Sequence, residues 1–167
     1  MNGPGAVTYG GKSFPNQRGQ AEGKQKDEQI IDSIIKDINN LKAEKKTFKD
    51  VSVSQFAEEN GWADCIAEKF KDKLKPTQLR KVFHSLKAVQ RKVEKEDPNH
   101  LFNRETVALL LPELAYAVGR ELIPEKFYKL FKTCFDAQLL QTNADFLRFM
   151  DFLTAVLAFH KYRNQRR

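Results

Sequence analysis

The sequence predicts an all-α protein: a compact bundle of about five to six helices preceded by a disordered N-terminal tail. Apolar residues recur at helical spacing along most of the chain after residue 26, and the only alternating strand pattern is the brief stretch at residues 48–53. The chain has 167 residues, 41% of them hydrophobic and 13 of them Phe. This composition is enough for the core of one domain.

Residues 1–26 are expected to form the disordered tail, because this segment is polar, rich in Gly and without apolar periodicity. Two roles stay open for the tail. It is either an extension without function or a segment that orders against a partner or RNA through Tyr9 and Phe14. Residues 27–163 form the expected single helical domain, and residues 164–167 form a short basic C-terminal tail.

The first two helical segments are recognised by their apolar faces and their boundary residues. The first is expected to begin near residue 27, where Ile and Leu share one face, and to end in the basic residues 42–46. The second carries Phe56 and follows Ser52 or Ser54, either of which can cap it. Gly61 is expected to split this segment in two before it continues to about residue 74.

The remaining helices are marked by Pro and by longer apolar runs. Pro76 occupies the first turn of the third helix, which ends at residues 97–99. The fourth is expected at residues 104–120, interrupted by Pro112, and the fifth begins at Pro124 and continues to about residue 139. The last helix, which opens at Asn143, is apolar on nearly all sides and is expected to be central and buried.

The third helix carries the most informative pattern. Its apolar residues gather on one side, and cationic or titratable side chains recur at steps of three and four residues on the other. This basic stripe consists of Arg80, His84, Lys87, Arg91 and Lys95. Acidic residues follow only at its end, whereas an ordinary solvated face mixes both signs. The stripe therefore indicates a surface for a polyanion, although a face that serves solubility alone fits the same spacing.

Total charge and the absence of targeting signals narrow the class of protein further. The 29 Lys and Arg residues against 22 Asp and Glu give a net charge of +7, which favours nucleic acid or another acidic partner. No signal peptide is visible, and the longest apolar stretch, at residues 107–111, is too short to span a bilayer. We therefore expect a cytoplasmic protein, in which Cys65 and Cys134 are buried free thiols.

No pattern typical of catalysis is present. The three His residues do not share metal-site spacing, and no two Cys residues lie within four positions of each other, so neither a metal nor a cofactor is predicted. The chain has no phosphate-binding Gly-rich loop and no nucleophile motif. Glu113 and Glu121 are single carboxylates of the kind that usually lie on the surface or cap helices. The sequence therefore predicts a protein that is not an enzyme.

Three short motifs occur in order along the chain: PTQLRK at residues 76–81, LAYAVGR at 114–120 and AFHKY at 158–162. Together they resemble the small helical subunit of type III-A CRISPR effector complexes, the Csm family, over about residues 29–163. The resemblance implies a non-catalytic subunit that helps to hold single-stranded target RNA paired to the guide RNA. Its neighbours would be the backbone subunit, the large subunit and stacked copies of itself, with the nuclease chemistry in the first two.

The resemblance and the basic stripe together define the expected RNA-binding residues. The family's basic positions fall on Arg80, Lys81, Arg120 and Lys161. The stripe adds His84, Lys87 and Arg91. Arg and Lys contacts to phosphates give affinity without reading bases, and guide–target pairing would read the sequence. The chain departs from the family in its longer tail and in Phe159, where Tyr is expected.

Some of these positions also have a purely structural interpretation. Arg120 follows Gly119 at an expected helix end, so capping of the terminal carbonyls fits as well as RNA contact. Tyr116 and His160 are both expected to belong to the core rather than to a binding surface.

Two other functions fit the same sequence. A helical protein-interaction adaptor would keep its charges in solvent, and charge reversal on the basic stripe would not change its RNA binding. A helix-turn-helix DNA-binding protein is suggested by the helix that follows the short turn after Leu74. Its basic residues, however, run along the whole helix instead of concentrating at the start.

Overall fold

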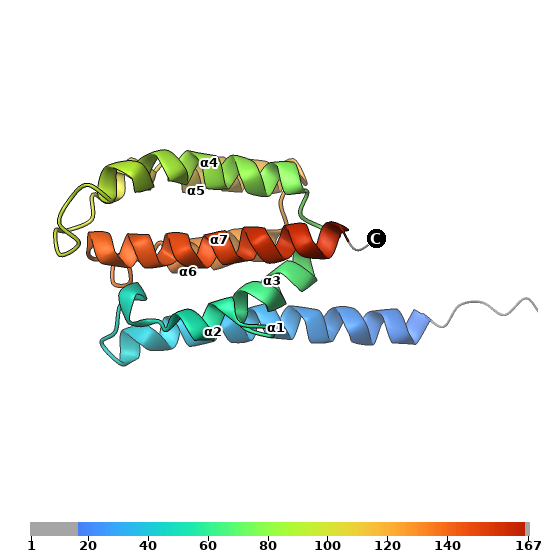
Figure 1. Cartoon of the computed structure of the whole chain (residues 1–167). Helices are drawn as coiled ribbons and strands as arrows, with labels where there is room; N and C mark the ends of the chain where they lie inside the picture. The colour runs from blue at the N-terminus through green and yellow to red at the C-terminus, as the bar shows by residue number, and fades with distance from the viewer. Residues whose placement is uncertain (1–16, 166–167) are drawn as a thin grey trace, which may run out of the picture.

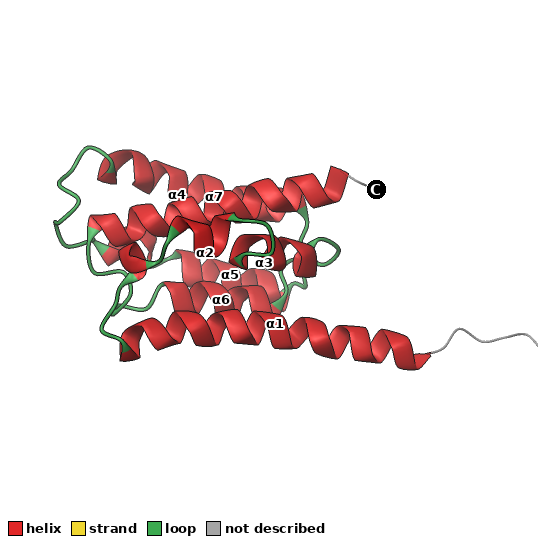
Figure 2. Cartoon of the chain, turned by 60° about the horizontal axis from the view of Figure 1, so that its bottom comes forward, coloured by secondary structure: helices red, strands yellow, loops and turns green. Residues whose placement is uncertain are grey.

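Helices make up the regular structure of residues 17–165, the part of the chain that the computed structural model describes, with side chains described from Gln29 onward. Seven α-helices lie in this part: α1 (Gln17–Ala43), α2 (Val53–Ala57), α3 (Trp62–Phe70), α4 (Pro76–Val93), α5 (Leu110–Gly119), α6 (Glu125–Cys134) and α7 (Asn143–Gln165). Two short 3₁₀ helices, Phe48–Asp50 and Arg104–Val107, lie in the connections. The predicted all-α class is confirmed (Figure 2).

The first helix is longer than its apolar pattern indicates. It begins at Gln17 rather than near residue 27, and so includes residues 17–26, which the sequence analysis assigned to the tail. Gln, Ala, Glu and Lys in this stretch are good helix formers, and such residues can extend a helix that is already nucleated. The proposed contacts of Tyr9 and Phe14 lie outside the described residues.

The last helix is central, as its apolar sequence predicts. Figure 1 shows α7 between α4 on one side and α1 to α3 on the other, and α7 packs against α2, α3, α4 and the first 3₁₀ helix. Its Phe residues form the middle of an aromatic core. The ring of Phe149 lies 5.7 Å from those of Phe48 and Phe131 and 5.1 Å from that of Phe135.

Two predicted start signals are confirmed around α2 and α3. Ser52, and not Ser54, caps α2, because its Oγ accepts a hydrogen bond of 3.3 Å from the backbone N–H of Gln55. Gly61 separates α2 from α3 and is the N-cap of α3. A Cβ at this position would lie 2.9 Å from the carbonyl oxygen of Glu58, so the chain needs Gly for this close approach.

The predicted interruption of the fourth helix at Pro112 is wrong. The helical segment breaks earlier, between the 3₁₀ helix and Leu110, and Pro112 lies inside the first turn of α5. The first four N–H groups of a helix have no acceptor within it, so the missing N–H of Pro costs nothing there. Similarly, α6 ends at Cys134 instead of near residue 139, because Asp136 accepts the backbone N–H of Gln138 and holds a turn.

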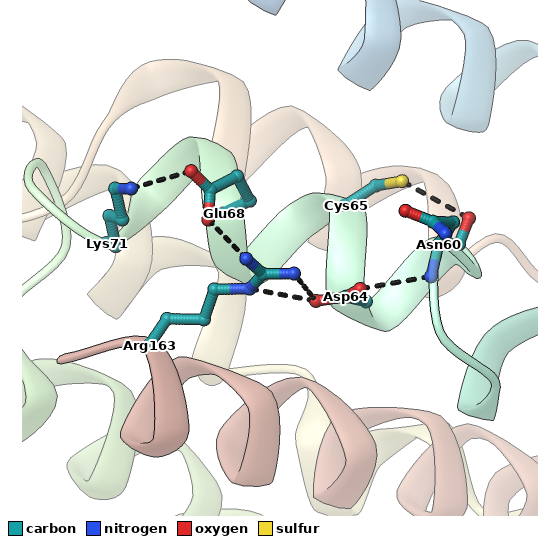
Figure 3. Close-up of polar contacts among 6 residues, drawn as sticks. All are labelled: Asn60, Asp64, Cys65, Glu68, Lys71 and Arg163. Carbon is teal, nitrogen blue, oxygen red and sulfur yellow. Dashed lines mark hydrogen bonds and ion pairs between the residues drawn. The ribbon is translucent and has the colours of Figure 1, made fainter. Parts of the chain in front are cut away.

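A network of ion pairs and hydrogen bonds connects the C-terminal end of α7 to α3 (Figure 3). The Arg163 guanidinium donates from Nε to Asp64 Oδ1 at 2.9 Å, and its Nη1 lies 2.9 Å from Glu68 Oε2. Asp64 is 2% exposed, and its other oxygen accepts the backbone N–H of Asn60. A hydrogen bond from Lys71 lowers the pKa of the Glu68 carboxyl. The network fixes the direction in which the last turns of α7 leave the core.

His160 belongs to the core, as predicted. It is 1% exposed, and the side-chain amide of Asn164 lies 3.2 Å from its Nδ1. Burial lowers the pKa of His160 below its ordinary value of 6.5, while backbone hydrogen bonds to Leu74 and Phe70 oppose this shift. The folded protein therefore favours the neutral imidazole.

This pKa shift predicts a loss of stability in mild acid. The unfolded chain binds a proton on His160 more readily than the folded chain does, because the pKa of His160 is lower in the folded state. The stability that the neutral His160 contributes to the folded protein is therefore present above pH 6.5 and is lost as the pH falls through the folded pKa. We expect urea unfolding between pH 7 and pH 5 to show this decline, and His160→Gln to flatten it. His84→Gln, at an exposed position, should leave the decline unchanged.

Candidate nucleic-acid interface

The orientation of α4 is set by its buried face. Lys75 is the N-cap residue and Pro76 is in the first turn, where its fixed φ favours the helix. On the side that faces α7, Leu79, Val82 and Leu86 are each at most 5% exposed. The opposite side of the helix is therefore held toward solvent, and this side carries the basic stripe.

The stripe residues within α4 lie on this outward side, and Lys95 lies just beyond the helix, which ends at Val93 instead of at residues 97–99 as predicted. Arg80, His84, Arg91 and Lys95 are exposed. Lys87 is half-buried: its Nζ donates a hydrogen bond of 2.9 Å to Gln90 Oε1 and lies 5.7 Å from the centre of the Phe83 ring. Neither contact neutralises the Lys87 charge, so all four Lys and Arg residues of the stripe contribute to one positive surface.

The cations of α4 make no ion pairs with described carboxylates. The helix contains five Lys and Arg residues and no Asp or Glu, and none of the five pairs with a carboxylate among residues 29–165. By contrast, Lys42 pairs with Asp136, and Lys126 pairs with Asp32. Repulsion between like charges at four-residue spacing costs about 0.2–0.5 kcal/mol per pair, and no internal anion relieves it on α4.

The start of α4 is also unusually positive. Helix N-termini favour Asp and Glu, because the backbone dipole places positive charge there. The first turn of α4 has no acidic residue, and the exposed Lys73 and Lys75 come just before it. These two lysines were missed in the sequence analysis because they precede the helix and do not share its periodicity. Lys92, also exposed, was missed because it lies beside the stripe.

The other predicted RNA-binding residues lie at one end of the molecule. Lys81 is exposed in the second turn of α4, Arg120 is exposed just after α5, and Lys161 is exposed near the end of α7. Figure 1 shows that the ends of α5 and α7 lie at the same end of the bundle as the start of α4. The structure thus brings the basic positions of the three motifs toward one end, and the stripe extends from there to Lys95.

The side chains of Tyr116, on α5, and Arg120, just after it, decide between the alternatives that the sequence left open. The Arg120 guanidinium lies 5.8 Å from the centre of the Tyr116 ring and makes no hydrogen bond to a described carbonyl, so its side chain does not cap α5. The expectation that Tyr116 is a core residue is wrong, because this side chain is 68% exposed. Tyr116 follows Leu114 by two residues, which places it on the opposite side of the helix from the buried Leu110 and Leu114.

The described part of the chain has two free thiols and no cluster of metal-ligating side chains. Among residues 29–165, no three His, Cys, Asp or Glu side chains gather in a group that could hold a metal ion. Cys65 and Cys134 are free, with Cys134 buried and Cys65 half-buried, and burial raises the pKa of both thiols. No described helix is sufficiently long and apolar to cross a membrane.

Comparison with known families identifies the chain. The family model described as Csm2 Type III-A matches residues 53–166, which is more than half of the chain and includes α2 to α7. Neither the curated proteins nor the solved structures gave a match. The matched segment contains all three motifs on which the resemblance was based. The chain therefore belongs to the Csm2 family, the non-catalytic small subunits of the type III-A CRISPR effector complex.

Proposed function

We propose that the exposed face of α4 binds the phosphate backbone of target RNA and of the guide–target duplex within the Csm complex. The observation that carries this proposal is the concentration of unpaired cations on one helix that has no acidic residue. Contacts of this kind give affinity without sequence preference, which a subunit that serves any guide requires. The RNA-binding residues are Arg80, Lys81, His84, Lys87, Arg91, Arg120 and Lys161.

The same proposal includes the partners of the complex. The subunit would work in the cytoplasm, beside the backbone subunit, the large subunit and further copies of itself. Its surface opposite α4 is formed in part by α1 and α6, where Lys126 and Asp32 are already paired with each other. This ion pair suits contact with protein better than contact with RNA, because its two charges neutralise each other and leave no net charge to attract phosphates.

Charge reversal on α4 tests the RNA-binding proposal. The variant Arg80→Glu/Lys87→Glu/Arg91→Glu is expected to bind single-stranded RNA of mixed sequence roughly 10²-fold more weakly than the wild type at about 0.1 M salt, because three phosphate contacts become repulsive. The measurement is fluorescence anisotropy with labelled RNA, after circular dichroism has shown that the variant is folded.

A matched control separates local contact from net charge. Lys36→Glu/Lys49→Glu/Lys132→Glu makes the same change in net charge at exposed positions on α1, the first 3₁₀ helix and α6. We expect this control to retain most of the affinity. Equal loss in both variants, or no loss in the α4 variant, would contradict the proposal and favour a protein-interaction adaptor. Preference for duplex DNA over RNA would favour the helix-turn-helix alternative.

A further inference from the structure

The Tyr116 side chain is unusually exposed for an aromatic residue of a folded domain. It is 68% exposed, and no other Phe, Tyr or Trp among residues 29–165 is as exposed; Tyr162 follows at 48%. Its hydroxyl makes no hydrogen bond to another described residue, and its ring makes no contact with another described aromatic ring. A large exposed ring with no aromatic neighbour is available to a ligand.

The ring is presented together with a cation. Arg120 lies one helical turn after Tyr116, and its guanidinium carbon is 5.8 Å from the ring centre. In this cation–π arrangement the guanidinium is held close to the ring while its donors stay free for another group. The pair therefore offers a flat aromatic surface beside a positive charge, which are the two groups that a nucleotide needs for its base and its phosphate.

The pair belongs to the helix that faces one of the unpaired cations of α4, Lys81, across a groove. A groove runs between α4 and α5, and its lining includes Lys81 and Ser85 from α4 and Glu113 and Ala117 from α5. Tyr116 lies one turn beyond Glu113, toward the end of α5. The end of α5, with Tyr116 and Arg120, lies at the same end of the bundle as the start of α4, with Lys81 (Figure 1), so a strand bound at Lys81 has the pair on the neighbouring helix.

We propose that Tyr116 and Arg120 form a stacking site for an unpaired base of the RNA strand whose phosphates lie on α4. This inference rests on the proposed function of α4 and adds a contact of different chemistry. Stacking on an aromatic ring accepts any base, because every base has a π-face, so the site is compatible with a subunit that does not read sequence. The guanidinium of Arg120 contacts the adjoining phosphate.

Three variants of α5 test the stacking site with single-stranded RNA of mixed sequence. Tyr116→Ala is expected to lower the affinity roughly 5- to 100-fold, which is the range for loss of one stacked base. Tyr116→Phe keeps the ring and should bind within about twofold of the wild type. Leu109→Ala removes another exposed apolar side chain of the same segment, at 75% exposure, and should bind as the wild type does.

Three further readouts distinguish stacking from charge. The dependence of affinity on salt concentration should be the same for Tyr116→Ala and the wild type, because no cation is removed. A 2-aminopurine base in the single strand should lose fluorescence on binding to the wild type and not to Tyr116→Ala, and the loss of affinity should disappear with fully paired duplex RNA.

The outcomes separate this inference from the proposed function. If the α4 charge variant loses RNA binding while Tyr116→Ala binds as tightly as the wild type, the stacking site is overturned and the phosphate surface stands. An equal loss in Tyr116→Phe and Tyr116→Ala would also overturn it, because the hydroxyl and not the ring would then be the contact. If the wild type itself binds no RNA, both proposals fail.

Discussion

Phe149→Ala is expected to lower the free energy of unfolding by about 3–5 kcal/mol, the usual cost of deleting a large buried aromatic side chain. Phe149 is 1% exposed, and its ring contacts three rings from outside α7, those of Phe48, Phe131 and Phe135. Their removal would leave a cavity at the centre of the helical bundle. Urea denaturation followed by far-ultraviolet circular dichroism measures the change.

A surface control and a milder variant make this prediction specific. Leu101→Ala removes a side chain that is 84% exposed and should change the free energy of unfolding by less than about 0.5 kcal/mol. Phe149→Leu retains much of the volume and should fall between the two. A cost near zero for Phe149→Ala would show that α7 is not the centre of the core.

Arg163→Ala is expected to cost about 3 kcal/mol, at the lower end of the range for breaking a buried ion pair. The substitution would leave the Asp64 carboxylate, 2% exposed, with only the backbone N–H of Asn60, and would remove the close cation from Glu68. The partial exposure of Arg163 keeps the cost below the upper end. Thermal and urea unfolding would both report it.

An exposed ion pair and a double variant test whether the cost of Arg163→Ala comes from its ion pair with Asp64. Lys129 and Glu125 are exposed partners on α6 at 3.5 Å, and Lys129→Ala should cost less than about 0.5 kcal/mol. Asp64→Asn removes the charge that Arg163 neutralises, so Arg163→Ala should be less harmful in that background. Additive costs in the double variant would mean that the pair has no coupling energy.

Helix positions could be predicted well where local rules decide them. Pro76, Ser52 and Gly61 act through backbone geometry within a few residues, and all three mark boundaries in the structure. The expectation for Pro112 was wrong because the same residue is tolerated in a first turn and disruptive in a helix interior. Apolar periodicity could not find the start of α1, because residues 17–26 are helical without it.

The candidate site was only partly predictable, because its defining feature depends on tertiary contacts. The outward direction of Arg80 and Arg91 follows from helical spacing alone. That the cations of α4 stay unpaired, while Lys126 pairs with Asp32 far away in sequence, becomes visible only in the folded chain. The exposure of Tyr116 was missed for the same reason: a Tyr in an apolar segment suggests core until the buried face of α5 is known.

The dependence of RNA affinity on salt concentration tests the central claim most directly, because its slope counts the cations displaced from the phosphates. For wild-type protein and single-stranded RNA we expect a log–log slope of roughly −2 to −3, which corresponds to three or four phosphate contacts. In Arg80→Glu/Lys87→Glu/Arg91→Glu the slope should approach zero, and in the Lys36, Lys49 and Lys132 control it should equal that of the wild type. Equal slopes for wild type and α4 variant would contradict the account, because the α4 cations would then contact no phosphates.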